Sequence, residues 1–313
     1  MGIIFWAIVL IISLAILVKS SDLFTITAER IGLYLKLSPF IVGVTIVAIG
    51  TSLPELISSI FAVIQNNSEI VAGNVVGSNI TNILLILGLS AIFAKEIKIK
   101  ETFLRIDLMV FITSVFILIL IMLNNTITLA ESLILVSCFI IYIIYIIKTK
   151  TPTGKEMKPD FKKEPLGTKT YLSLIISILL IFIAAKYTID SIVQISSLIG
   201  IGKEIIAATV VALGTSLPEL AVSVSAAKKG KPEIAVGNVL GSNIFNIFIV
   251  TGVAGLFGTI IITQQILTIG SIFLLLSTFL YFFGIKDRSI SSWEGLFFVL
   301  LYALYIIQII GWA

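Results

Sequence analysis

The chain has 313 residues, of which 58% are hydrophobic and only 12% charged, with a formal net charge of +4. This charge content is about half of the roughly 25% usual in soluble domains, and apolar runs long enough to cross roughly 30 Å of hydrocarbon recur, which excludes a soluble protein. One cysteine and no histidine exclude a disulfide framework, a zinc site and imidazole bases.

The apolar runs predict an all-α polytopic membrane protein with ten transmembrane helices. The first run lacks a basic n-region and a clear small-residue cleavage site, so we interpret it as a retained helix rather than a signal peptide. In chain order, the predicted spans cover residues 3–18, 40–65, 70–93, 103–123, 127–147, 170–186, 204–227, 233–257, 264–284 and 293–311.

Basic residues are distributed unequally between the two sides of these spans. Of the 21 Lys and Arg residues, 19 fall in connections on one side, and only Lys186 and Lys203 fall on the other. The positive-inside rule therefore predicts a cell-membrane protein with both termini extracellular and loop 149–169 cytoplasmic. This loop has three prolines and many charges, which predicts a solvated linker between two halves, 1–148 and 170–313.

The two halves contain the same motifs. The segment GTSLPEL occurs at Gly50–Leu56 and Gly214–Leu220, and GNVVGSNITNI at Gly73–Ile83 has the counterpart GNVLGSNIFNI at Gly237–Ile247. At this offset of 164 residues, 23 of the 39 positions in Thr45–Ile83 are identical in the second copy. Because one unit contains five spans, an odd number, the second copy crosses the membrane in the opposite sense. The sequence thus predicts an inverted repeat, which in transporters places a site near the midplane.

The GTSLPEL motif predicts a broken helix inside the membrane. Pro54 has no N–H and Gly50 is flexible, so we expect freed carbonyls around Ala48–Thr51. Irregular backbone is tolerated at this depth only where it lines a cavity or is buried in protein. Carbonyls, hydroxyls and a carboxylate suit Na⁺ or Ca²⁺, and we expect Glu55 and Glu219 to meet at one site as the only acids near mid-membrane.

The polar residues of the second motif lie on one helix face, at spacings of four. They are Asn74, Ser78 and Asn82 in the third span, and Asn238, Ser242 and Asn246 in the eighth. An alternative for Asn74 and Asn238 is a helix-capping role. Asn79 and Asn243 lie off the stripe and are predicted to tie helices together. The glycine pairs are predicted to serve close helix packing; they are Gly73 with Gly77, and Gly237 with Gly241.

These paired motifs in a five-plus-five chain resemble the α-repeats of the cation/Ca²⁺ exchanger superfamily, and are most similar to those of prokaryotic sodium/calcium exchangers. The resemblance implies two inverted halves with helices 2, 3, 7 and 8 around the ions. It also implies antiport, usually of three Na⁺ inward for one Ca²⁺ outward, by alternating access as helices 1 and 6 slide across the core.

The resemblance also implies a set of ligands. Glu55 and Glu219 bind Ca²⁺ together with the carbonyls of Thr51 and Thr215. The sodium sites and the central site draw on the remaining residues: Ala48, Thr51, Ser52, Ser78, Asn82, Ala212, Thr215, Ser216, Ser242 and Asn246. Some potassium-dependent and archaeal relatives have Asp where this chain has Asn246, so potassium co-transport is not expected. Gly77 and Gly241 stand where proton-coupled relatives typically have an acid, which favours sodium coupling.

Three other functions are alternatives to sodium/calcium antiport. The first is a Ca²⁺/H⁺ antiporter in which the same glutamates carry protons, and the second is a cation channel. The third, an intramembrane hydrolase, is disfavoured because the chain has no His and no aspartate pair at the key positions, so an enzyme is not expected. The expected partners are Na⁺ and Ca²⁺ as substrates and the lipid bilayer, with no cofactor and no nucleic acid, in a chain compatible with a monomer.

Overall fold

The computed structural model describes residues 2–34, 48–98, 105–150, 167–228, 230 and 232–311. These residues are almost wholly helical. Seven helices among them are long and apolar enough to cross a membrane, or eight if the bent pair Lys203–Thr215 and Leu217–Lys228 forms one span. The shorter apolar helices are Leu53–Ile64 and Asp107–Met122. The chain is therefore an all-α polytopic membrane protein, as predicted. Most of the predicted linker lies outside the described residues.

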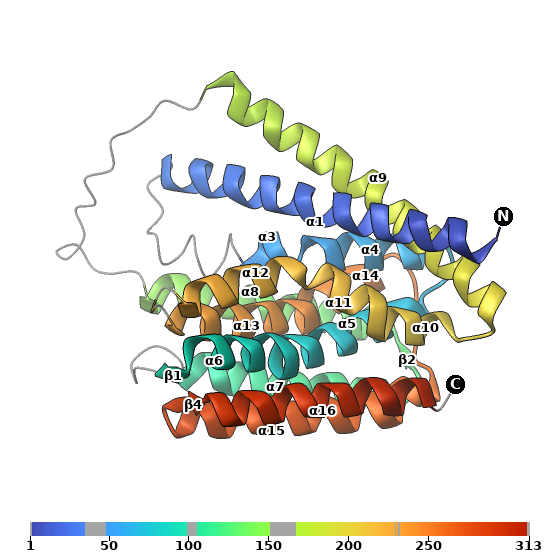
Figure 1. Ribbon diagram of the computed structural model, residues 1–313. Helices are drawn as coiled ribbons and strands as arrows, with labels where there is room; N and C mark the ends of the chain where they lie inside the picture. Colours follow the sequence, from blue (N-terminus) through green and yellow to red (C-terminus); the bar gives the residue numbers. More distant parts are fainter. Residues whose placement is uncertain are drawn as a thin grey trace.

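The first half of the chain contains α-helices, one π-helix (η2) and two short strands (Figure 1). In order they are α1 (Ile3–Tyr34), α3 (Ala48–Thr51), α4 (Leu53–Ile64), α5 (Glu69–Ile80), η2 (Thr81–Leu87), α6 (Gly88–Ala94), β1 (Glu96–Lys98), α7 (Arg105–Met122), β2 (Thr126–Ile127) and α8 (Leu129–Lys150).

The second half repeats this order with three further π-helices. Its elements are α9 (Thr168–Ile199), α10 (Lys203–Ile206), η3 (Ala207–Val211), α11 (Ala212–Thr215), α12 (Leu217–Lys228), α13 (Pro232–Phe245), η4 (Asn246–Val250), α14 (Thr251–Gly255), β3 (Ile260–Ile261), η5 (Ile266–Gly270), α15 (Ser271–Lys286), β4 (Ser289–Ser291) and α16 (Ser292–Gly311).

Helices α1 and α9 are much longer than predicted. Each has 32 residues, whereas the hydropathy pattern predicted spans 3–18 and 170–186. The first predicted span ends just before Lys19 and the second ends at Lys186, but a helix continues wherever its backbone hydrogen bonds are satisfied, including where it leaves the hydrocarbon. The two helices contact each other and lie together over one face of the other helices (Figure 1).

Each of the two small sheets joins the two halves of the chain. Strand β1 pairs antiparallel with β4, and β2 pairs antiparallel with β3. The sheets lie at opposite ends of the helix bundle, and the two chain termini lie at the same end (Figure 1). This arrangement matches the sequence repeat, because the strand that follows α6 in the first half corresponds to the one that follows α14 in the second.

Helix α5 lies in the centre of the bundle and is buried from Ile70 to Ile80. It contacts α10 and η3 so closely that a Cβ on Gly73 would clash with the Glu204 carbonyl, and one on Gly77 with the Ala208 carbonyl. The predicted packing role of this first glycine pair is confirmed. Positions 40 and 44, which correspond to Glu204 and Ala208 in the repeat, lie outside the described residues.

Candidate functional site

Both GTSLPEL motifs break their helix at the serine. Ser52 separates α3 from α4 with φ −90° and ψ 10°, and Ser216 separates α11 from α12 with φ −84° and ψ 9°. These near-identical angles lie in the sparsely populated bridge region. Pro54 and Pro218 then occupy the first turn of the next helix, where a missing N–H is tolerated. The span containing Ser216 bends by 42° at this point.

The two breaks bring the acids of the two halves together. The Ser52 hydroxyl donates to Glu219 Oε1 at 2.9 Å, and the Ser216 hydroxyl donates to Glu55 Oε1 at 3.2 Å. Each carboxylate thus receives a hydrogen bond from the break in the opposite half. Both glutamate side chains are 0% exposed, so neither faces lipid. Ser242 of α13 adds a further donor to Glu219 Oε1, at 3.2 Å.

A second set of residues fixes the backbone beside each acid. The Asn74 amide donates to the Glu55 carbonyl at 3.3 Å and to Ser59 Oγ at 3.2 Å. In the second half, Asn238 donates to the Glu219 carbonyl at 3.4 Å and to Ser223 Oγ at 3.1 Å. Both asparagines are inside helices, so the capping alternative is wrong.

Sequence reasoning missed the roles of Ser59 and Ser223. The signal was available, because these serines are identical residues at the same offset of 164. They were overlooked because a serine in an apolar helix usually bonds its own backbone.

The remaining predicted site residues surround the two breaks. Thr51 and Thr215 are buried immediately before Ser52 and Ser216, and Ala48 begins α3. The Ala212 carbonyl accepts the Ser216 N–H at 3.1 Å. Ser78 is 0% exposed and donates to Asn74 Oδ1 at 3.5 Å rather than to a carboxylate.

Asn82 is the second residue of η2, which follows α5, and Asn246 is the first residue of η4, which follows α13; both are 0% exposed. The Asn82 amide donates to Asn243 Oδ1 at 2.9 Å, and Asn243 donates to the Asn79 carbonyl at 3.5 Å. Asn243 therefore ties helices together, as predicted. The Asn79 side chain donates instead to Val75 of its own helix, so the same prediction is wrong for Asn79.

Several buried polar atoms around the breaks have no hydrogen-bond partner among the described residues. They are Oε2 of Glu55, Oε2 of Glu219, Oδ1 of Asn82, and Oδ1 and Nδ2 of Asn246. Leaving such an atom unsatisfied costs about 1–3 kcal/mol, and more when it is charged. Four of the five are oxygens, the ligand type that Na⁺ and Ca²⁺ prefer, so this donor set fits a hard cation.

The comparisons with known proteins cover nearly the whole chain. Residues 5–148 and 169–311 match the family described as sodium/calcium exchanger protein. The sodium/calcium exchanger MaX1 of Methanosarcina acetivorans is 33% identical over 339 residues, which cover 96% of this chain and 97% of the relative. The putative antiporter CaxA of Alkalimonas amylolytica is 34% identical over 257 residues, covering 80% and 79%.

A solved structure of the sodium-calcium exchanger NCX_Mj, soaked with Na⁺ and Sr²⁺, has a similar fold. It is 31% identical to this chain, with a TM-score of 0.69 and coverage of 97% of this chain and 99% of that one. All of these relatives are named as exchangers or antiporters rather than as enzymes.

Proposed function

Because the chain belongs to the sodium/calcium exchanger protein family, as its paired motifs predicted, we propose that it is an antiporter that exchanges Na⁺ for Ca²⁺ across the membrane. The observation that carries the proposal is the reciprocal pairing of Ser52 with Glu219 and of Ser216 with Glu55. It gathers two buried carboxylates from opposite halves into one oxygen-rich site. Two ionised glutamates balance the charge of one Ca²⁺.

The proposed architecture is ten transmembrane helices in two inverted five-helix repeats. The seven long apolar helices, the bent pair and the two shorter apolar helices together make ten. The exchange of strands between halves, β1 with β4 and β2 with β3, and the matching breaks at Ser52 and Ser216 support the inverted repeat.

We assign the transported ions to the oxygens around the two breaks. Glu55 and Glu219 hold Ca²⁺ with the carbonyls of Thr51 and Thr215, and Na⁺ competes for overlapping oxygens. The further proposed ligands are Ala48, Ser52, Ser78, Asn82, Ala212, Ser216, Ser242 and Asn246. The unpartnered oxygens of Glu55, Glu219 and Asn82 support this assignment, because a cation would satisfy atoms that no described residue satisfies.

Alternating access is proposed to come from movement of α1 and α9 relative to the other helices. Helix α1 contacts α3 and α11, which directly precede the two breaks, and α9 contacts α4 and α10. At Gly214, two residues before the break at Ser216, an added Cβ would lie 2.8 Å from Leu14 of α1. A shift of α1 would therefore change which side chains cover this break. The site would then open to one side or the other.

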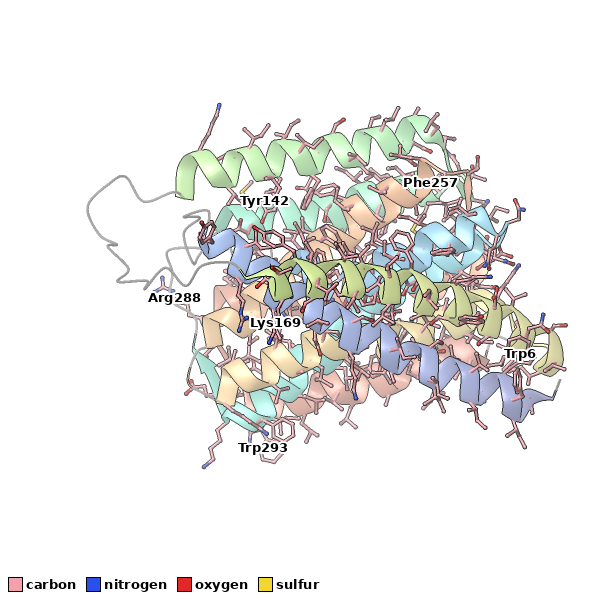
Figure 2. All side chains as sticks on the ribbon, turned by 90° about the horizontal axis from the view of Figure 1, so that it is seen from above. Trp6, Tyr142, Lys169, Phe257, Arg288 and Trp293 are labelled. Carbon is pink, nitrogen blue, oxygen red and sulfur yellow. The ribbon has the colours of Figure 1, made fainter. Side chains whose placement is uncertain are left out.

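The proposed orientation places the lysine-rich end of the bundle in the cytoplasm. Figure 2 shows Lys169 and Arg288 toward one end of the helices, and Trp6 and Phe257 toward the other. With Na⁺ inward and Ca²⁺ outward at three to one, each cycle moves one net charge. A membrane potential then contributes about 2.3 kcal/mol per 100 mV.

The test is ⁴⁵Ca²⁺ uptake into proteoliposomes loaded with Na⁺ and diluted into Na⁺-free medium, with the pH gradient collapsed by an ionophore. Uptake that disappears when internal Na⁺ is replaced by choline supports the proposal. Uptake driven only by a pH gradient would instead make the chain a Ca²⁺/H⁺ antiporter. Conductance steps in planar bilayers, without coupling to either gradient, would make it a channel.

A further inference from the structure

Four buried asparagines lie at matching positions of the two repeats: Asn79 and Asn243 end the two GNVxGSN motifs, and Asn82 and Asn246 follow three residues later. All four are at most 1% exposed. The residues are the same at equivalent positions of the two repeats, but their hydrogen-bond partners differ. Asn82 Nδ2 donates to Asn243 Oδ1 at 2.9 Å. The equivalent bond in the other repeat would run from Asn246 Nδ2 to Asn79 Oδ1. These two atoms both have no hydrogen-bond partner among the described residues.

The bond to Asn243 determines which end of the Asn82 amide is available. An asparagine amide has a donor end and an acceptor end, which point in opposite directions from the same carbon. With Nδ2 held by Asn243, Oδ1 is the free end, and it is fully buried without a donor in the described chain. If the amide were reversed, it would direct N–H groups at a cation and repel it.

The position of Asn82 relates this oxygen to the ion site. It lies one turn beyond Ser78, on the helix face that carries the predicted polar stripe. The η2 segment that begins beside it packs against α12, which carries Glu219, and against α13, which carries Ser242. Asn243 is itself held in place, because its Nδ2 donates to the Asn79 backbone carbonyl at 3.5 Å.

We propose that Asn243 is a positioning residue, which orients the Asn82 amide so that its oxygen faces the transported ion, whereas Asn79 has no such role toward Asn246. The inference rests on the proposed exchange function. Asn79 and Asn243 occupy equivalent positions of the two repeats, but only Asn243 then affects how the ion is bound. Removing the partner that orients a metal ligand typically weakens metal binding about 10- to 100-fold.

The experiment compares Asn243→Leu with the matched control Asn79→Leu, which places the same substitution at the equivalent position of the first repeat. In the proteoliposome assay, Asn243→Leu is expected to raise the half-saturating Ca²⁺ concentration about tenfold, with a smaller change in maximal rate. Asn79→Leu is expected to change the half-saturating Ca²⁺ concentration by less than about twofold, because residue 79 keeps the backbone carbonyl that accepts the Asn243 Nδ2 hydrogen bond. Asn243→Asp keeps an acceptor for Asn82 Nδ2 and is expected not to raise the half-saturating concentration.

Combination with Asn82→Leu distinguishes positioning from a general loss of structure. If Asn243 acts through Asn82, the double variant will lose no more Ca²⁺ affinity than Asn82→Leu alone. Equal effects of Asn79→Leu and Asn243→Leu, additive effects in the double variant, or failure of Asn243→Asp to keep the affinity would each overturn the inference. If Asn243→Leu does not fold, Asn243→Ala, which removes the same acceptor with a smaller side chain, replaces it in the comparison with Asn79→Ala. Absence of Na⁺-driven uptake in the unaltered protein would instead reject the proposed function.

Discussion

At the scale of single residues, the most informative feature is the exchange of serine hydroxyls between the two halves. A buried carboxylate needs hydrogen bonds or a cation to offset the loss of water. The hydroxyls of Ser52 and Ser242 donate to Glu219 Oε1, and the Ser216 hydroxyl donates to Glu55 Oε1. In each carboxylate the second oxygen has no hydrogen-bond partner among the described residues. The two acids therefore differ in their surroundings although their motifs are identical.

Replacing either acid by its amide tests the site directly. We expect Glu55→Gln and Glu219→Gln each to lower Na⁺-driven Ca²⁺ uptake more than about a hundredfold, because loss of one partner from a buried charge pairing costs about 3–5 kcal/mol. The matched control is Glu294→Gln, since Glu294 is an exposed acid that accepts the Ser291 N–H at the start of α16. Uptake at the control rate in either site variant would mean that the ion does not bind there.

At the scale of elements, close helix packing and π-helices shape the core. Helix α5 reaches the backbone of α10 and η3 only because Gly73 and Gly77 have no side chain. The π-helix η3 is contacted by α16 through Tyr305, whose hydroxyl donates to the Ala208 carbonyl at 3.1 Å. A π-helix displaces a carbonyl from its regular partner, and here a tyrosine from the last helix provides a donor.

The glycine contact gives a stability prediction. Gly77→Ala is expected to lower the free energy of unfolding by about 1–3 kcal/mol, because its Cβ would meet the backbone of Ala208, which cannot rotate away. Thermal unfolding in detergent measures this loss. Gly311→Ala is the control, because that helical glycine has no described atom within 4 Å of an added Cβ. Equal melting temperatures for the two variants would contradict the packing described here.

The tyrosine contact gives a second prediction for the elements. Tyr305→Phe keeps the buried ring but removes the hydroxyl that donates to Ala208, so we expect a loss of about 1 kcal/mol of unfolding free energy. Tyr171→Phe serves as the control, because the Tyr171 side chain is 50% exposed. In the same detergent, the melting temperature of Tyr305→Phe should lie below that of Tyr171→Phe. If they coincide, the Tyr305 hydroxyl does not stabilise the π-helix.

At the scale of the whole molecule, α1 and α9 form one layer and the other helices form the rest of the bundle (Figure 1). Within the layer, Thr188 Oγ1 donates to Ser13 Oγ at 3.0 Å. Between the layer and the other helices, Gln65 Nε2 donates to Asp190 Oδ1 at 3.1 Å. If α1 and α9 move together during exchange, the first contact persists through the cycle and the second does not.

Cross-linking at each of these two contacts tests whether α1 and α9 move together relative to the other helices. In a Cys138→Ser background, which removes the only cysteine, the double variant Gln65→Cys/Asp190→Cys is treated with a bifunctional thiosulfonate reagent. We expect Ca²⁺ uptake to stop and to return after reduction, because the link fixes α9 to α4. The matched pair Ser13→Cys/Thr188→Cys links α1 to α9 and should leave uptake largely intact. Transport by the cross-linked Gln65/Asp190 pair would show that α9 does not move relative to α4.

Much of the site could be predicted from the sequence because its chemistry is local and occurs twice. Pro54 and Pro218 remove backbone donors at the same offset, so both broken helices and their buried acids followed from the residues alone. The charge content and the apolar runs likewise determined the membrane class. These properties depend on the covalent structure of a short segment, and they hold whatever else the segment contacts.

The tertiary structure decided what depends on distant parts of the chain. Ser52 bonds the acid of the other half rather than its own, α1 and α9 continue beyond the lysines where hydropathy ended them, and Asn243 holds Asn82 while Asn79 bonds its own helix. A hydrogen bond forms with whichever partner the packing brings within about 3 Å. No local pattern records which of two equivalent partners that will be, so two copies of one motif acquire different contacts once the helices pack.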